Sequence, residues 1–120
     1  MDDKGFWLKL EQLVALSRVR IDRPRGTAHP RYANFHYPYD YGHLQGTESS
    51  DEHEVDVWIG SRSARNVTGV VFTVDVEKRD LEAKVLLACT SEEARRIAEI
   101  HNEGSQGAML IERHLRRGTA

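Results

Sequence analysis

The chain has 120 residues, of which 39% are hydrophobic and 30% charged, and its formal net charge is -2. This length and composition predict one globular domain with a single core, and the small negative charge disfavours nucleic acid or an anionic membrane as a partner. No apolar run is long enough to cross a bilayer, and Cys89, the only cysteine, excludes an internal disulfide. The first residues also lack the pattern of a secretory signal, so a cytoplasmic protein is expected.

The N-terminal part of the chain predicts a helix, a strand and a basic loop. Apolar residues recur at helical spacing over residues 4–16. Residues 17–22 alternate apolar and polar side chains, which is typical of a half-exposed strand. The following loop, residues 23–34, carries two of the three prolines and several basic side chains, including Arg25 and Arg31. Arginines on a restrained loop suit phosphate or carboxylate binding, although plain surface charge would explain any one of them.

The remainder of the chain predicts short strands and a second helix. Residues 35–42 alternate aromatic and polar side chains, but Pro38 limits them to an edge or bulged strand, and Gly42 and Gly46 mark a turn. Four further strands are predicted at residues 55–59, 67–76, 84–88 and 107–111. A charged turn at 77–82 joins the second of them to the third. The segment Thr90-Ser-Glu-Glu93 has the pattern of a capping box, so a helix should run from there to about residue 101.

These elements predict a mainly β fold with two helices. Successive strands joined by turns fit an antiparallel Greek-key barrel, because parallel pairs need longer crossovers and a closed barrel has no exposed edges. The predicted domain spans residues 1–120. Residues 1–17 form its N-terminal helical region, a second helix follows the barrel, and residues 113–120 form a frayed tail.

The segment 37–58 is unusually rich in tyrosine, acidic residues and histidine. Asp51, His53 and Asp56 lie where a loop enters a strand, and Glu77 and Glu82 lie on the next predicted hairpin turn. If the two turns meet at one mouth of the barrel, their carboxylates converge and a hard cation such as Mg²⁺ is expected to neutralise them. Acidic surface turns would explain any single carboxylate equally well.

Phosphate is the anion expected beside a cation that these carboxylates hold. A metal-bound water can attack a phosphorus atom at neutral pH. The side chains expected to bind the phosphate oxygens by charge or hydrogen bonds are Arg25, Arg31, Tyr41 and Lys84.

Two stretches of this sequence resemble the signature region of the soluble family I inorganic pyrophosphatases. They are Tyr37-Pro-Tyr-Asp-Tyr-Gly42 and Asp51-Glu-His-Glu-Val-Asp56, and Ile21-Asp-Arg-Pro24 is similar to the segment at which the family's first strand ends. The resemblance implies a five-stranded Greek-key barrel of the OB type. It also implies a homo-oligomer that hydrolyses pyrophosphate, or a related phosphoanhydride, to phosphate with the help of Mg²⁺.

The same resemblance implies roles for individual residues. Asp51, Asp56, Glu77 and Glu82 match metal ligands, whereas Tyr41 and Lys84 match phosphate-binding residues and Arg31 stands for a lysine. His53 occupies the place of an aspartate that ligates metal and accepts the proton of the attacking water. An imidazole can do both, but it would shift the preference from Mg²⁺ towards Mn²⁺ or Co²⁺. We therefore expect catalytic roles for His53, Asp56 and Tyr41, with reduced or altered activity.

Two alternatives to a diphosphatase remain open. One is a non-catalytic relative that binds phosphate or metal and acts as a regulator, which the replacement at His53 favours. The other is an OB-type nucleic-acid binder that stacks bases on Phe35, Tyr37, Tyr39 and Tyr41. The acidic segment and the negative net charge argue against the second alternative.

Overall fold

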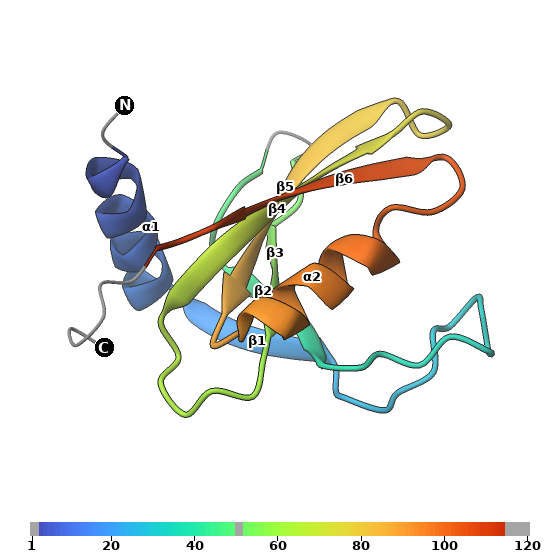
Figure 1. Ribbon diagram of the computed structural model, residues 1–120, viewed down its shortest axis with the longest axis horizontal. Coiled ribbons are helices and arrows are strands. Elements are labelled where there is room, and N and C mark those ends of the chain that lie inside the picture. Colours follow the sequence, from blue (N-terminus) through green and yellow to red (C-terminus); the bar gives the residue numbers. More distant parts are fainter. Residues whose placement is uncertain (1–2, 50–51, 115–120) are drawn as a thin grey trace.

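The computed structural model describes residues 3–49 and 52–114. This part of the chain forms two helices and six strands (Figure 1). In chain order they are α1 (Lys4–Leu16), β1 (Arg18–Arg23), β2 (Asp40–Gln45), β3 (Val55–Ile59), β4 (Val67–Asp75), β5 (Asp80–Leu87), α2 (Ser91–Ile100) and β6 (Gln106–Glu112). Neither helix is long and apolar enough to cross a membrane.

The six strands form one mixed sheet in the order β1-β2-β3-β5-β4-β6. All neighbouring strands are antiparallel except β3 and β5, which run parallel. The predicted mainly β architecture with two helices is thus confirmed. The strand number and pairing differ from the prediction, because the described part of the chain has six strands rather than five and one pair is parallel. Closure of the sheet into a barrel is not detected among the described residues, since no strand pairing joins β1 to β6.

The parallel pair arises because β4 lies outside it. The chain leaves β3 at Ile59, runs along β4, turns at residues 76–79 and returns in β5 beside β3. This connection contains a whole strand, so it is long enough for the crossover that parallel strands require. The arrangement places side chains of β3 and β5 next to each other, and this juxtaposition positions the candidate site.

The two faces of the sheet carry separate hydrophobic clusters. On one face Trp7 of α1 packs with Leu44, Val57 and Val85. On the other face lies a second cluster, to which Ile97 of α2 contributes. The alternation along β3 explains this division, because successive side chains of a strand point to opposite faces. Val57 therefore faces α1, while its neighbours Asp56 and Trp58 share the other face, as the sequence predicted.

The second strand begins later than predicted. Residues 35–39 belong to the loop between β1 and β2, and the strand covers Asp40–Gln45. Gly42, predicted in a turn, lies within this strand opposite Ile21. A Cβ atom at Gly42 would collide with the carbonyl group of Arg20, so glycine is required by the close approach of β1 rather than by a turn.

The fifth strand begins earlier than predicted. It starts at Asp80, so Glu82 lies within the strand and only Glu77 remains on the turn. Leu81 pairs with Val74 across the hairpin. The charged residues around Leu81 made this part of β5 look like a turn in the sequence. The first helix and the capping box of α2 are confirmed, with Thr90 Oγ1 accepting from Glu93 N–H at 3.1 Å. The predicted tail at 113–120 lies largely outside the described residues.

Candidate active site

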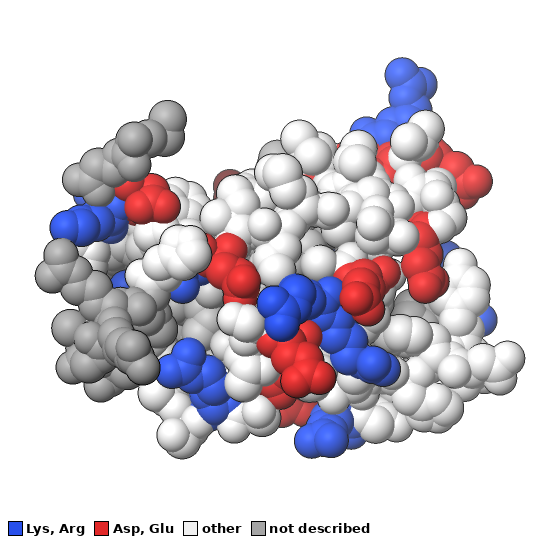
Figure 2. Space-filling view, in the orientation of Figure 1, with Lys and Arg blue, Asp and Glu red and all other residues white. Residues whose placement is uncertain are grey.

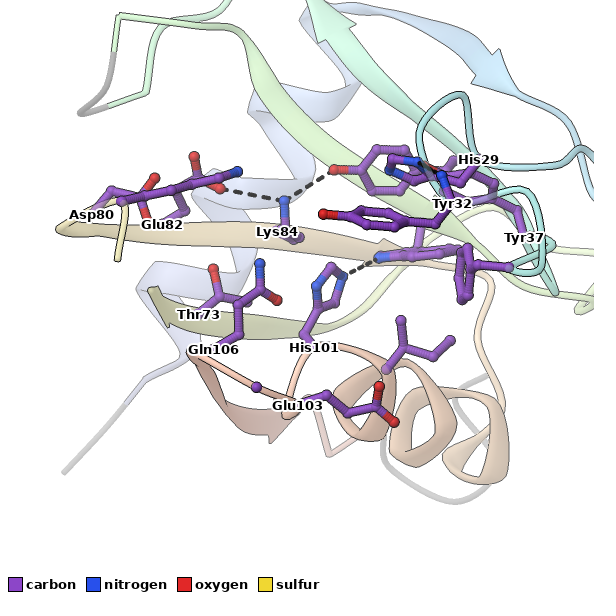
Figure 3. Close-up of a pocket in the computed structure, with 16 residues that line it drawn as sticks. His29, Tyr32, Tyr37, Thr73, Asp80, Glu82, Lys84, His101, Glu103 and Gln106 are labelled. Carbon is purple, nitrogen blue, oxygen red and sulfur yellow. Dashed lines mark hydrogen bonds and ion pairs between the residues drawn. The ribbon is translucent and has the colours of Figure 1, made fainter. Parts of the chain in front are cut away.

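A pocket of about 690 Å³ opens on the face of the sheet that α2 covers (Figure 3). Strands β2, β3, β4 and β5 supply part of its wall, and the loop at residues 24–39 supplies another part. The rest comes from the turn between β4 and β5, the end of α2, the segment that follows it and the start of β6. Lys84 of β5 lies between aromatic rings on one side and the carboxylates of Asp80 and Glu82 on the other. The pocket therefore combines a charged part with an aromatic part.

The charged part is organised around the ammonium group of Lys84, which is only 6% exposed. Lys84 Nζ donates to Asp56 Oδ2 at 2.9 Å and to Tyr41 Oη at 3.0 Å, and Glu82 Oε2 lies 3.4 Å away. Tyr41 in turn donates its hydroxyl proton to Asp56 Oδ2 at 2.8 Å. Because the three strands β2, β3 and β5 are adjacent, side chains from distant parts of the sequence meet at one cation.

The environment fixes the charge state of this group at neutral pH. Burial by itself lowers the pKa of Lys84, but the oxygen of Tyr41 and the carboxylate of Asp56 outweigh it and raise this pKa above its ordinary value. Burial also raises the pKa of Tyr41 well above its ordinary value, against the opposing charge of Lys84. Lys84 is thus an ammonium ion and Tyr41 a neutral phenol, which can donate one hydrogen bond and accept another.

His101 lies at the end of α2 and faces the same pocket. Trp58 Nε1 donates to His101 Nε2 at 3.0 Å, and an indole N–H group can only donate, so the ring nitrogen is the acceptor. Burial, with the nearby charge of Lys84, lowers the pKa of His101 to about 4. His101 is therefore a neutral imidazole at pH 7.

The structure brings together four of the predicted site residues and separates the others. Tyr41, Asp56, Glu82 and Lys84 form the group just described, and the predicted proximity of Asp56 and Glu82 is confirmed. Asp56 contacts Lys84 without lining the pocket itself. The other predicted residues that do not line the pocket are Arg25, Arg31, His53 and Glu77, all of which are exposed. Asp51 lies outside the described residues.

The sequence reasoning did not assign a role in the site to several other residues that line the pocket. They are His29, Tyr32, Thr73, Lys78, Ile100, Glu103, Gly104 and Gln106. For Thr73, the alternation of side chains along β4 was a usable signal in the sequence, because Thr73 lies on the strand face that also carries Val71. Nothing in the sequence pairs His101 with Trp58, because the two are 43 positions apart and no motif links them.

Comparisons with known proteins place the chain in a family. The inorganic pyrophosphatase family model matches residues 9–111, which is most of the 120 residues. The chain belongs to the inorganic pyrophosphatase family. The match includes both segments on which the resemblance was recognised, and it includes β1 to β5 and α2 entirely.

A solved structure supports a pyrophosphatase-like fold. The chain is similar to the crystal structure of an inorganic phosphatase from Anaplasma phagocytophilum, with a TM-score of 0.55 and 16% sequence identity. The similarity covers 78% of this chain and 81% of the other. No curated protein sequence matches. At such low identity the shared property is the fold alone.

The chemistry of the pocket fits the divalent cation that this family typically uses. Its charged lining residues are Asp80, Glu82 and Glu103 against Lys78 and Lys84, and Asp56 already contacts Lys84. A further polyanion such as pyrophosphate would be repelled unless cations accompany it. Carboxylate oxygens are also the ligands that Mg²⁺ prefers.

The predicted set of metal ligands is not tested by the structure. Within residues 3–49 and 52–114, no three His, Cys, Asp or Glu side chains gather closely enough to hold a metal ion. Asp51, the first of the predicted ligands, is outside that range. The metal site of Asp51, His53, Asp56, Glu77 and Glu82 therefore stays a prediction.

Proposed function

We propose that the chain is a metal-dependent inorganic diphosphatase that hydrolyses pyrophosphate to two phosphates. The observation that carries the proposal is that Lys84 and Tyr41 line the pocket and both contact Asp56, in a member of the inorganic pyrophosphatase family. Such a group offers a fixed cation for a phosphate oxygen and a phenol that holds the carboxylate of Asp56.

In this proposal each side chain of the group has one task. Lys84 binds a phosphate oxygen, because its ammonium is fixed in place and remains charged at neutral pH. Tyr41 donates a hydrogen bond to Asp56, holding that carboxylate towards the pocket. Asp56 and Glu82 would hold a divalent cation together with Asp51, Glu77 and His53, and when bound this cation would supply a water of lowered pKa.

Two predicted phosphate-binding residues, Arg25 and Arg31, are exposed and do not line the pocket. Arg25 and Arg31 would bind phosphate only if their side chains reach the pocket from the loop at residues 24–39. The backbone N–H of Arg25 donates to Asp40 Oδ1 at 2.8 Å, which fixes the start of this loop beside β2. Their substrate-binding role, the cytoplasmic location and the homo-oligomeric state all stay predictions.

One observation favours a second candidate function, that of a non-catalytic phosphate-binding or metal-binding relative. Lys84 is satisfied by the chain's own Asp56 and Glu82, so both carboxylates already have a cation. In this alternative the family fold retains a binding pocket, while the replacement at His53 removes turnover.

Phosphate release from pyrophosphate tests the proposal and separates the two candidates. The assay is run with Mg²⁺, Mn²⁺ or Co²⁺ and, as a control, with a chelator. Release with at least one divalent ion and none with the chelator is the expected result. Binding of pyrophosphate in calorimetry without release under any of these conditions would support the non-catalytic alternative instead.

A further inference from the structure

The pocket is larger than an inorganic pyrophosphate ion requires. Its volume of about 690 Å³ falls within the range of roughly 300–1,000 Å³ found for pockets that bind drug-sized molecules. Pyrophosphate is a small, compact anion, and the group around Lys84 occupies only one part of the lining. The rest of the volume is available for a second chemical group on the same ligand.

Aromatic rings line that remaining part in a continuous series. The Tyr32 ring lies 4.9 Å from His29, and His29 stacks on Tyr37 at 6.0 Å with only 9° between the ring planes. Tyr37 is 5.6 Å from Tyr41, whose hydroxyl contacts Lys84 (Figure 3). The series thus leads from an exposed ring to the proposed phosphate site.

Core packing does not explain the outer end of this series. Tyr32 is 67% exposed and belongs to neither of the two hydrophobic clusters. Because Tyr32 also lines the pocket, its exposed ring can offer a face to a flat ligand there.

The loop that carries these rings is held in place by its own backbone. Gly26 N–H donates to Tyr37 O at 2.8 Å, and Tyr37 N–H donates back to Thr27 O at 3.0 Å. His29 N–H donates to Phe35 O at 2.9 Å, and His29 Nδ1 accepts from the backbone N–H of Tyr32 at 3.3 Å. The backbone that carries the rings is therefore pre-organised, which reduces the entropy cost of ordering this loop when a ligand binds.

We propose that the organic substrate of this site is a nucleoside 5′-diphosphate. A nucleoside diphosphate is a pyrophosphate esterified at one end, so its phosphates suit Lys84 while its base stacks on the rings around Tyr32 and His29. Stacking on aromatic side chains suits every base, because each has a flat π-face. The proposal rests on the diphosphatase function and adds a substrate class to it.

The proposed reaction is hydrolysis of the phosphoanhydride bond. The oxygen of a water molecule forms a bond to the β-phosphorus, and the bond from this phosphorus to the bridging oxygen breaks. The bridging oxygen leaves on the nucleoside monophosphate, orthophosphate is the second product, and one proton passes to solvent. No oxidant or second substrate is required.

The test compares kcat/KM for ADP and for inorganic pyrophosphate in the wild type, in Tyr32→Ala and in Tyr32→Trp. Loss of one stacking ring is expected to lower the ADP-to-pyrophosphate ratio of kcat/KM by roughly 5- to 150-fold in Tyr32→Ala. Tyr32→Trp keeps an aromatic face and should restore the ratio. Phe6→Ala, which removes an exposed ring from α1 outside the pocket, is the matched control and should leave the ratio unchanged.

Different outcomes overturn this inference and the proposed function separately. Hydrolysis of pyrophosphate with no turnover of ADP overturns the substrate class and leaves the diphosphatase function intact. Equal kcat/KM for ADP and for isopentenyl diphosphate, which has no aromatic group, has the same two consequences. If neither ADP nor pyrophosphate is hydrolysed, calorimetry with ADP and Mg²⁺ decides. Binding that Tyr32→Ala weakens supports the ligand class, and absence of binding overturns it.

Discussion

Lys84 Nζ lies 2.9 Å from Asp56 Oδ2, and this contact joins two strands that are parallel neighbours in the sheet. The β4 strand separates β3 from β5 in sequence but lies on the far side of β5 in space. Consequently a carboxylate and an amine that are 28 positions apart meet in the pocket. On the face shown in Figure 2, acidic and basic side chains are interspersed without an extended patch of one sign.

Replacing Lys84 by glutamine is expected to affect both stability and binding. The ammonium is buried, and its loss leaves the carboxylates of Asp56 and Glu82 facing each other without a cation. We expect the free energy of unfolding to fall by roughly 1–3 kcal/mol, a modest loss because both carboxylates are partly solvated. The affinity for pyrophosphate should fall at least about tenfold. Urea denaturation and calorimetry measure the two effects. Lys78→Gln, which changes an exposed lysine of the same pocket, should alter stability by less than about 0.5 kcal/mol, and equal losses in both variants would contradict the account.

Tyr41→Phe tests the hydrogen bonds of the phenol alone. The ring stays in its aromatic cluster, while the bond to Asp56 and the bond from Lys84 are lost. Hydrogen bonds to charged groups contribute about 1.5–3 kcal/mol, so we expect a loss of about 2 kcal/mol in urea denaturation and a lower kcat. Tyr39→Phe is the matched control, since no described residue forms a hydrogen bond with that hydroxyl, and a similar loss there would show that the effect is not specific to the site.

His101 predicts a pH dependence of stability. Its pKa in the folded chain is lowered from the ordinary 6.5 to about 4, so between these pH values the unfolded chain binds a proton at this residue and the folded chain does not. Stability from this residue is thus complete above about pH 6.5 and is lost as the pH falls towards 4, by roughly 3 kcal/mol in all. Urea denaturation at pH 7 and pH 4.5 measures it.

His101→Gln supplies the control for that measurement. Glutamine can still accept the hydrogen bond of Trp58 but carries no titrating ring. The difference in stability between the two pH values should shrink in this variant. An unchanged difference would assign the pH dependence to the carboxylates rather than to His101.

His53→Asp tests the position at which the resemblance implies an aspartate in place of this histidine. An aspartate adds the negative charge and the oxygen ligand that Mg²⁺ prefers. We expect kcat/KM for pyrophosphate to rise at least about tenfold with Mg²⁺ and to change less with Mn²⁺. His36→Asp makes the same exchange on an exposed residue outside the pocket and should change neither value. An equal gain with both metals would show that His53 does not select the cation.

Local patterns allowed most of the fold to be predicted, and long-range pairing accounts for what was missed. The alternation in β3 placed Asp56 and Trp58 on one face, and the capping box placed the start of α2. The parallel pairing of β3 with β5 has no local signal, because it depends on where β4 lies in the sheet. Antiparallel pairing throughout was therefore predicted in place of a mixed sheet.

The same distinction applies to the site. Lys84 and Tyr41 were predicted as phosphate-binding residues from the acidic segment beside them, and the family resemblance implied the same role. The contact of Trp58 with His101, in contrast, depends on how α2 packs on the sheet. The aromatic rings of the loop at residues 24–39 were visible in the sequence only in part, as candidate stacking residues. Their order, from Tyr32 through His29 to Tyr37, is set by backbone hydrogen bonds that no residue pattern specifies.

We propose that Asp56 and its partner Lys84 belong to a diphosphatase centre. Phosphorus NMR of pyrophosphate in the presence of Mg²⁺ tests it most directly, by comparing the wild type with Asp56→Asn and with Glu99→Gln, an exposed carboxylate on α2. The account predicts that the pyrophosphate signal is converted to orthophosphate by the wild type and by Glu99→Gln, and roughly 100-fold or more slowly by Asp56→Asn. Conversion by Asp56→Asn at the wild-type rate would contradict it.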